Sequence, residues 1–323
     1  MKKAGWQGAG VLVLMGVAMI LSACSSPGPD SGTAAMPDTE PYTIGMSQCN
    51  LGEPWRVQMN RDIENAAKEH PELRVIFKDA QNQTTIQQSH VREFVSQGVD
   101  LIIVSPLEAA PLTGPIAEAY KGGIPVIVLD RAVLGEEFTL FIGADNVRIG
   151  EAAGRWIKEK LGGAGKVVEL KGLMTSIPGQ DRNAGFRKGI EGSDIEVVFD
   201  ADMRWLQPNA QSEMESALTR FPDIDLVYAH NDPGAYGAYL AAKAAGREKD
   251  MFFVGIDGLP QEGLAYVERG ILSATFEYPT GGKEAITSAL AILRGEEPPA
   301  KHVVLPSRFY TKENLAQGGQ WLQ

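Results

Sequence analysis

The hydrophobic positions from Tyr42 onward alternate between two patterns along the chain. Continuous apolar runs such as 99–104 (VDLIIV) and 124–129 (IPVIVL) are typical of strands that are covered on both faces of a sheet. Between these runs, as in 55–70, apolar residues recur every three or four positions, which predicts amphipathic helices. Regular alternation of this kind predicts an α/β fold with parallel sheets and helices on both faces.

The alternation divides into two successive series. The first predicts strands at 42–47, 73–77, 99–104, 124–129 and 138–142, and helices at 55–70, 84–97 and 112–120. The second opens with a helix at 147–161, capped by Asp145, and predicts strands at 167–170, 196–199, 226–228, 252–256 and 272–276, and helices at 185–191, 209–220, 235–245 and 263–269. A last helix at 283–293 precedes a strand near Val303. Two series of this length predict two doubly wound, flavodoxin-like lobes.

The N-terminus has the features of an export signal. Lys2 and Lys3 precede an apolar run from Gly8 to Leu21, which is short for a membrane span but suits a signal-peptide core. The following LSAC at 21–24 resembles the bacterial lipoprotein signal, in which the cysteine carries lipid; the alternative is an ordinary cleaved signal. We therefore expect a signal peptide at 1–23, lipidation at Cys24, and a flexible Pro- and Gly-rich tether at 24–41. The chain would be exported and lipid-anchored, facing the periplasm or the extracellular side.

Composition and charge exclude several other classes of protein. A net charge of −11 disfavours a nucleic-acid partner, which would require a basic surface. If Cys24 carries lipid, Cys49 has no disulfide partner. The four histidines are scattered, and no Glu/His cluster has metal-ligand spacing, so we expect neither a metal nor a cofactor. Asp130 and Asp257 would suit a glycosidase, but flanking arginines would keep both ionised, so we do not expect an enzyme.

Polar residues gather where the predicted strands end. In doubly wound sheets, ligands lie beyond the carboxyl ends of the strands. At these positions stand Glu53, Trp55, Arg56, Asp130, Arg131, Asp181, Arg182, Trp205, Asn231, Asp257 and Glu277. Carboxylates, guanidiniums and amides can hold neighbouring hydroxyls, and indoles can cover the apolar face of a sugar ring. The alternative is that the strand-end Asp and Asn residues are only helix caps. Their convergence favours a cleft for a polyhydroxylated ligand.

The order of the motifs is similar to that of a known family, the ribose-binding-like (type 1) periplasmic substrate-binding proteins of ABC importers. From Tyr42 to the C-terminus, the motifs are IGMSQ and EPWR (44–56), SQGVDLIIVSPLEA (96–109), IPVIVLDR (124–131), KVVELKG and QDRNAGF (166–186), VYAHNDPGAYGA (227–238), VGIDG (254–258) and ATFEYP (274–279). Within the family, the likeness is to the galactofuranose-binding members. The loop LMTSIPG at 173–179 departs from the Gly/Ala-rich loops of the family.

The resemblance implies a function and a set of binding residues. A monosaccharide (galactofuranose, another hexose or a pentose) would lie between the lobes, and a monomeric chain would deliver it to an ABC permease. From the first lobe, the residues that would contact the sugar are Trp55, Arg56, Asp130 and Arg131. From the second lobe they are Asp181, Arg182, Trp205, Asn231 and Asp257, with Glu277 at a hinge crossing.

The family's three-crossover hinge would divide the chain into two lobes. The first lobe would comprise 42–144 plus 277–305, and the second 145–276 plus 306–323. Two other functions are known on this fold. A sensor that presents its ligand to a membrane receptor kinase stays open as an alternative. A repressor module is excluded, because an export signal is present and no helix-turn-helix precedes Tyr42.

Overall fold

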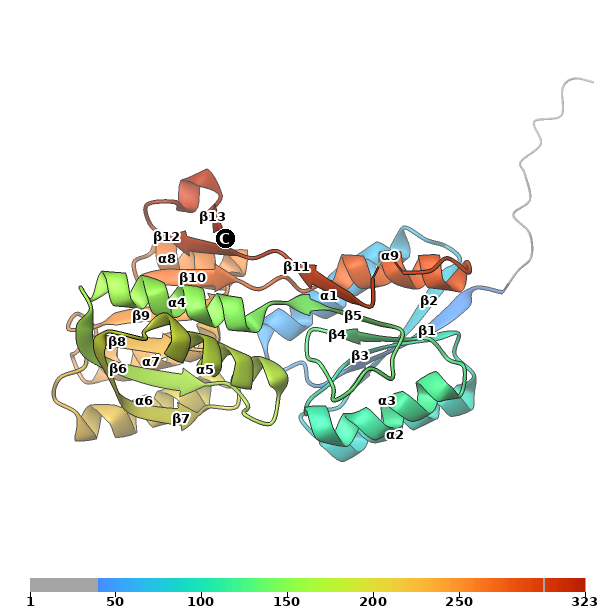
Figure 1. The fold of residues 1–323 in the computed structure, drawn as a ribbon, viewed down its shortest axis with the longest axis horizontal. Helices are drawn as coiled ribbons and strands as arrows, with labels where there is room; N and C mark the ends of the chain where they lie inside the picture. Colours follow the sequence, from blue (N-terminus) through green and yellow to red (C-terminus); the bar gives the residue numbers. More distant parts are fainter. Residues whose placement is uncertain (1–39, 299, 323) are drawn as a thin grey trace, which may run out of the picture. The chain divides into compact units, whose positions relative to one another are not determined.

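The computed structural model describes residues 40–298 and 300–322. The expected signal peptide, Cys24 and nearly all of the expected tether lie outside these residues. In the described chain, strands and helices alternate and build two sheets, which define a first and a second lobe (Figure 1). No helix in this part of the chain is both long and apolar enough to cross a membrane.

The first lobe contains a parallel sheet with the order β11-β5-β4-β3-β1-β2. Its strands are β1 (Tyr42–Gln48), β2 (Leu73–Asp79), β3 (Leu101–Ser105), β4 (Val126–Leu129), β5 (Leu140–Ala144) and β11 (His302–Leu305). Helices α1 (Pro54–Lys68) and α9 (Gly282–Leu293) cover one face, and α2 (Thr84–Gln97) and α3 (Ala109–Lys121) cover the other (Figure 1). Every residue of β3 is buried, as its continuous apolar run predicts.

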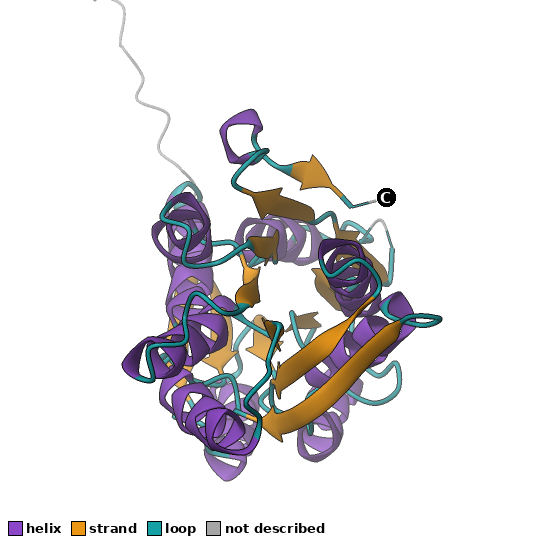
Figure 2. Cartoon of the chain, turned by 90° about the vertical axis from the view of Figure 1, so that its left-hand side faces the viewer, coloured by secondary structure: helices purple, strands orange, loops and turns teal. Residues whose placement is uncertain are grey.

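The second lobe contains a larger sheet with the order β13-β12-β10-β9-β8-β6-β7. Its strands are β6 (Ala164–Lys171), β7 (Asp194–Asp202), β8 (Leu226–Ala229), β9 (Phe252–Asp257), β10 (Ala274–Glu277), β12 (Arg308–Thr311) and β13 (Gln320–Trp321). Helices α4 (Asn146–Lys160) and α5 (Ile177–Gly189) pack on one face, and α6 (Gln207–Arg220) and α7 (Asp232–Ala244) on the other. Figure 2 shows helices on both sides of the strands.

The C-terminal strands of the second lobe were not predicted. β12 pairs antiparallel with β10, and β13 pairs antiparallel with β12, with the short 3₁₀-helix η2 (Leu315–Gln317) between them. These segments are only four and two residues long and lack a continuous apolar run, so the sequence pattern gives no strand signal there. They extend the sheet past its helical layers at the edge seen at the top of Figure 2.

Two helices differ from their predicted form. α5 begins at Ile177, eight residues before the predicted start, because Pro178 fits a first helical turn, where no backbone N–H is needed. The predicted helix at 263–269 begins as a π-helical turn, η1 (Pro260–Leu264), before α8 (Ala265–Glu268).

The close contact between α4 and α5 explains two glycines in α5. A Cβ atom on Gly185 would lie 2.1 Å from the carbonyl oxygen of Val147, and one on Gly189 would lie 2.4 Å from that of Glu151. Only glycine allows the two backbones to approach this closely. This packing fixes α5, whose first turns carry residues of the candidate site.

The chain passes between the two sheets three times. The passages lie between β5 and α4, between β10 and α9, and between β11 and β12. Asp145 caps α4 directly after the first passage, with its Oδ1 accepting the N–H of Arg148 at 2.9 Å, as predicted. Glu277 is the last residue of β10 and pairs with Asp257 in the second sheet.

Candidate functional site

A small cavity lies between the two lobes, at the carboxyl ends of the parallel strands. It is lined by Glu53, Trp55, Arg56, Asp130, Pro178, Arg182, Trp205, Asn231, Asp257 and Tyr278. Seven of these were predicted from the sequence, and both lobes contribute. The lobes also touch beside it, where the N–H of Ala109 donates to the carbonyl oxygen of Thr175 at 3.3 Å. The space open to the centre of a water molecule is only about 20 Å³. The lobes are therefore closed on each other.

In the first lobe, a buried ion pair forms one wall of the cavity. Arg56, in the first turn of α1, places its Nη1 2.5 Å from Oδ2 of Asp130 and 2.8 Å from Oγ of Ser105. Burial alone would raise the pKa of Asp130, but Arg56, Arg131 and the Tyr278 hydroxyl outweigh it and hold the pKa below its usual value. Burial would likewise lower the pKa of Arg56, and Asp130 instead keeps it above the ordinary value. Both members of the pair therefore stay charged.

In the second lobe, the carboxylate of Asp257 is buried but unpaired. The residue ends β9 and is 6% exposed, and its carboxylate has no hydrogen-bond donor in residues 40–298 and 300–322. Burial and the neighbouring carboxylate of Asp232 raise its pKa well above the ordinary value, and Arg182 offsets this only in part. A buried carboxyl group without a donor is costly, so its oxygens are available to hydroxyl donors in the cavity.

Arg182 connects the cavity to the body of the second lobe. Its Nε donates to Oδ1 of Asn146 at 2.9 Å, and its Nη1 donates to the carbonyl oxygen of His230. The guanidinium carbon lies 5.2 Å from the ring centroid of Trp205 and 4.4 Å from that of Tyr278. These contacts hold the side chain in one orientation between two aromatic rings.

Aromatic rings from both lobes line the cavity. The rings of Trp55 and Tyr278 have centroids 5.1 Å apart, and Trp55 Nε1 donates to the carbonyl oxygen of Tyr278 at 2.8 Å. Trp205 lies on the second-lobe side, 5% exposed, and its indole Nε1 is buried without an acceptor in the described chain. The cavity thus offers flat apolar walls together with one unused indole donor.

Asn231 combines two roles that the sequence left as alternatives. Its Oδ1 accepts the N–H of Gly234 at 3.0 Å and so caps α7. Its Nδ2 donates to the carbonyl oxygen of Trp205 at 2.9 Å, which fixes the loop that carries the indole. The side chain also lines the cavity, so the capping residue is at the same time part of the candidate site.

Three cavity residues have strained backbones. Asp130, Trp205 and Asp257 have φ angles of 68°, 67° and 140°, in the range that favours glycine. Each such residue costs on the order of 1–3 kcal/mol, and such strain is often found at ligand sites. The rest of the fold stabilises this arrangement, which is further support for a functional site here.

Three predicted residues do not line the cavity. Arg131 lies behind it, with its guanidinium carbon 5.3 Å from the Trp205 ring, and its Nη1 donates to the carbonyl oxygen of Leu107 at 3.1 Å. Asp181 lies half-buried on α5, near Asp145, and burial and that carboxylate raise its pKa. Glu277 lies beside Tyr310, whose hydroxyl donates to its Oε2 at 3.4 Å. Neighbouring residues on a helix or strand face different ways, so Arg182 and Tyr278 take the places facing the cavity.

Three lining residues were missing from the binding set that the resemblance implied, although Glu53 stood among the polar residues at strand ends. Glu53 is 7% exposed, and its Oε1 accepts a hydrogen bond from Asn50 at 2.7 Å. Pro178 lies in the first turn of α5, inside the loop that departs from the family pattern. Tyr278 follows β10 in the motif ATFEYP, and its place directly after a strand was the signal that could have identified it.

Charges around the cavity balance one another. Three carboxylates and three guanidiniums lie at or beside it: Glu53, Asp130, Asp257, Arg56, Arg131 and Arg182. Several donors have no acceptor in the described chain, namely Nε and Nη2 of Arg131, Nε of Arg56 and Nε1 of Trp205. No group of three His, Cys, Asp or Glu side chains in residues 40–298 and 300–322 could hold a metal ion. The arrangement suits a neutral ligand with many hydroxyl groups.

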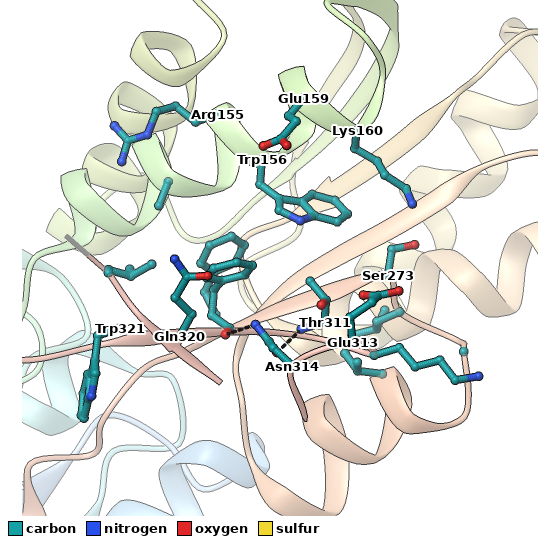
Figure 3. A pocket seen from close by; sticks show the side chains of 18 residues that line it. Arg155, Trp156, Glu159, Lys160, Ser273, Thr311, Glu313, Asn314, Gln320 and Trp321 are labelled. Atoms are coloured by element: carbon teal, nitrogen blue, oxygen red, sulfur yellow. Dashed lines mark hydrogen bonds between the residues drawn. The ribbon is translucent and has the colours of Figure 1, made fainter. Parts of the chain in front are cut away.

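A larger pocket lies elsewhere on the second lobe, between α4 and the C-terminal strands (Figure 3). Its space for water centres is about 1050 Å³, and Trp156, Lys160, Phe309 and Gln320 are among its lining residues. It contains none of the predicted site residues. Its Asn314 is occupied with local backbone bonds, from Thr311 N to Oδ1 at 2.8 Å and from Nδ2 to the carbonyl oxygen of Phe309 at 3.3 Å. We therefore regard the smaller cavity as the candidate site.

Comparisons with known proteins agree with this geometry. The sequence profile of the periplasmic binding protein domain matches residues 44–297. The chain is similar to the ribose import binding protein of Bacillus subtilis, with 32% identity over 91% of this chain and 95% of that protein. It is also similar to the galactofuranose-binding protein of Escherichia coli, with 33% identity over 75% of this chain and 77% of that protein.

Solved structures give the same result. The fructose-binding periplasmic domain of a hybrid two-component system superposes with a TM-score of 0.83 and 42% identity, covering 86% of this chain and 93% of that one. These likenesses confirm the predicted fold class and the predicted resemblance to ribose- and galactofuranose-binding proteins. The matched proteins are binding proteins, which supports the prediction that the chain is not an enzyme.

Proposed function

This chain belongs to the periplasmic binding protein family, and we propose that it is the sugar-binding component of an ABC importer. One observation carries the proposal: a buried carboxylate without a donor, Asp257, shares the cavity with the unused indole donor of Trp205. A hydroxyl group both donates and accepts, so neighbouring hydroxyls of a sugar satisfy both residues at once. The indole walls would cover the apolar face of the ring.

The relatives narrow the class of sugar that we propose. Solved structures of similar proteins contain β-D-fucofuranose and L-arabinofuranose, and others bind galactofuranose or fructose. We propose a neutral monosaccharide in its five-membered ring form, either a hexose or a pentose. The balanced charge around the cavity supports a neutral ligand, because a charged sugar would leave one ionic group buried and unpaired.

We propose that the sugar enters when the lobes part. The cavity is too small for a monosaccharide in the closed form described here, so the lobes must open for binding and close on the sugar somewhat less tightly. The three passages near residues 144–145, 276–277 and 305–307 would act as the hinge. The moving bodies would be 42–144 plus 277–305 and 145–276 plus 306–323. Sugar contacts in both lobes would favour the closed form, which a permease can then recognise.

We also propose that the chain is exported and anchored to the membrane by lipid. The signal peptide at 1–23, lipid at Cys24 and the tether at 24–41 would hold a monomeric binding protein at the outer face of the cell membrane. Treating intact cells with palmitate analogues and testing a Cys24→Ala chain checks this directly. Loss of label and release of the variant from membranes is the expected result.

A ligand-presenting sensor is the second candidate. It is favoured by the 42% identity to the periplasmic domain of a hybrid two-component system. Uptake of radiolabelled sugar separates the two candidates. Deleting the gene of an importer component abolishes uptake at low sugar concentration. Deleting the gene of a sensor leaves basal uptake in place and removes the transcriptional response to sugar.

Calorimetry on residues 42–323 tests sugar binding itself. The panel is D-ribose, D-fructose, L-arabinose, D-galactose and myo-inositol, with glucuronate and glucosamine as charged controls. We expect at least one neutral member to bind with micromolar or tighter affinity and both charged controls to bind much more weakly. Failure of every neutral sugar, or preference for a charged one, would contradict the proposal.

A further inference from the structure

Tyr278 uses all of its polar atoms in bonds to residues at or beside the cavity. It follows β10, at the second passage between the lobes, and is 4% exposed. Its backbone N–H donates to the carbonyl oxygen of Asp257 at 3.0 Å, and its carbonyl oxygen accepts from Trp55 Nε1 at 2.8 Å. Its hydroxyl donates to Oδ1 of Asp130 at 2.7 Å and accepts from Nδ2 of Asn146 at 3.2 Å.

The partners of this one residue come from both lobes. Trp55 and Asp130 belong to the first lobe, and Asn146 and Asp257 to the second. Asn146 is the first residue of α4 and so lies directly after the first passage between the sheets. The hydroxyl of Tyr278 therefore joins two of the three connecting segments at a single atom.

The hydrogen bonds continue into the second lobe. Asn146 Oδ1 accepts from Nε of Arg182, and Nη1 of Arg182 donates to the carbonyl oxygen of His230. A continuous chain of hydrogen bonds thus runs from Asp130, which faces the cavity from the first lobe, through Tyr278 and Asn146 to Arg182, which faces it from the second. Movement of one lobe relative to the other must break a bond in this chain or bend its geometry.

The bond to Asp130 is of the stronger kind. Asp130 is ionised, and a hydrogen bond to a charged acceptor contributes about twice as much as a neutral one. Burial, followed by the nearby Asp130, raises the pKa of Tyr278 above its ordinary value, so the hydroxyl keeps its proton and remains a donor. If the lobes part and the hydroxyl loses this acceptor, Asp130 keeps its first-lobe partners Arg56, Ser105 and Arg131.

From this geometry we infer that Tyr278 is a positioning residue that couples sugar contacts to hinge closure. The inference rests on the proposed sugar-binding function and deepens it. The hydroxyl stabilises the closed arrangement by joining the ligand-facing charges of the two lobes across the connecting segments. A sugar that orders Asp130 and Arg182 would thereby strengthen the same chain of bonds that holds the lobes together.

The test is the variant Tyr278→Phe, with Tyr228→Phe as its matched control. Tyr228 is a fully buried tyrosine of β8 whose hydroxyl has no partner in the described chain, so its removal breaks no hydrogen bond. Affinity is measured by calorimetry with the member of the sugar panel that the unmodified protein binds most tightly. Association and dissociation rates come from stopped-flow tryptophan fluorescence. Urea unfolding of both variants verifies that each still folds cooperatively.

We expect Tyr278→Phe to weaken affinity about tenfold, because the loss of one hydrogen bond to a charged group weakens binding by about that much. The loss should lie in faster dissociation, with the association rate within about twofold of the unmodified protein. Tyr228→Phe should leave both rates unchanged. Equal affinity in Tyr278→Phe, or a loss confined to the association rate, would overturn the inference while leaving sugar binding intact.

A second measurement needs no sugar. Small-angle X-ray scattering of the sugar-free protein reports the balance between open and closed forms. We expect a larger radius of gyration for Tyr278→Phe than for the unmodified protein, and no change for Tyr228→Phe. Identical scattering of all three proteins overturns the inference even if no sugar of the panel binds, so its failure and that of the proposed function can be told apart.

Discussion

The two lobes present opposite arrangements at the same cavity. In the first lobe, Asp130 is saturated: Arg56 and Ser105 bond to one oxygen and Tyr278 to the other. In the second lobe, Asp257 is also buried, but its carboxylate receives no hydrogen bond in the described chain. The pKa of Asp130 is lowered and that of Asp257 is raised. The same side chain is thus a satisfied structural ion in one lobe and an unsatisfied acceptor in the other.

Unpartnered hydrogen-bond donors, in contrast, are found in the first lobe. In the first lobe, Arg131 leaves Nε and Nη2 buried without acceptors, next to the ring of Trp205. Arg131 lies behind the closed cavity, so these donors would face a ligand only in a cavity widened by the sugar. Such a ligand would accept hydrogen bonds on its first-lobe side and donate them to Asp257 on its second-lobe side. From this difference we propose that Asp257 is an acceptor for sugar hydroxyls and that Asp130 orients Arg56.

The largest expected effect comes from replacing the unsatisfied acceptor. Asp257→Asn replaces one carboxyl oxygen, an acceptor for hydroxyl donors, with an NH₂ group, so we expect sugar affinity to fall about 100-fold, as the loss of two hydrogen bonds would give. The same change removes the carboxyl group that Asp232 repels, so the melting temperature of the sugar-free protein should rise. Calorimetry and thermal unfolding measure the two effects, which have opposite signs.

Asp250→Asn is the control, because Asp250 is an exposed residue outside the cavity. It should leave both the affinity and the melting temperature unchanged. If Asp257→Asn lowers the melting temperature, the carboxylate has a stabilising partner and the contrast between the lobes is wrong. If its affinity equals that of the unmodified protein, Asp257 is not the acceptor.

A smaller effect should come from the donor side. Arg131→Lys keeps the positive charge but loses the two guanidinium N–H groups that lack acceptors, so we expect affinity to fall about tenfold. Arg247→Lys is the matched control, since Arg247 donates to the carbonyl oxygens of Leu218, Phe221 and Pro222 away from the cavity. It should cost stability and leave sugar affinity unchanged. Equal affinities for both lysine variants would remove Arg131 from the site.

The sequence predicted most of this arrangement because strand ends are visible in a pattern of apolar runs. Asp130 and Asp257 follow such a run directly, Asn231 follows one after a single residue, and parallel strands bring their ends to one edge. The antiparallel strands β12 and β13 were missed because they are too short for a periodic signal. Local pattern also could not separate Glu277 from Tyr278, since facing direction at a passage between sheets depends on the register of β10 with β9.

The local sequence pattern does not show in which direction the pKa of each carboxyl group is shifted. Asp130 and Asp257 each stand at the end of an apolar strand. The adjacent Arg131 accounts for part of their difference. The rest comes from residues distant in the chain: Arg56 and Tyr278 for Asp130, and Asp232 for Asp257. Flanking arginines were predicted to keep both residues ionised. The pKa of Asp130 is lowered accordingly, whereas the pKa of Asp257 is raised, because burial and Asp232 act there against Arg182.

The smallest expected effect comes from another carboxyl group of the second lobe whose pKa is raised. Glu262, in η1, has a buried Oε2 without a partner, and burial and Asp232 raise its pKa to about 7. Its ordinary pKa is 4.5, so between pH 4.5 and 7 the folded chain keeps a proton that the unfolded chain has lost. The free energy of unfolding therefore falls as pH rises through this window, and the loss is complete above it. Glu262→Gln removes this loss.

Urea unfolding at pH 5 and pH 8 measures the difference. At pH 8 we expect Glu262→Gln to be more stable than the unmodified protein by about 1 kcal/mol, a value reduced because the side chain is partly exposed to solvent. At pH 5, where the glutamate is already protonated, the two should be equally stable. Glu118→Gln, at an exposed position of α3, should show no difference at either pH. If Glu262→Gln gains the same stability at both pH values, the gain comes from packing and not from removal of the unpaired charge of Glu262.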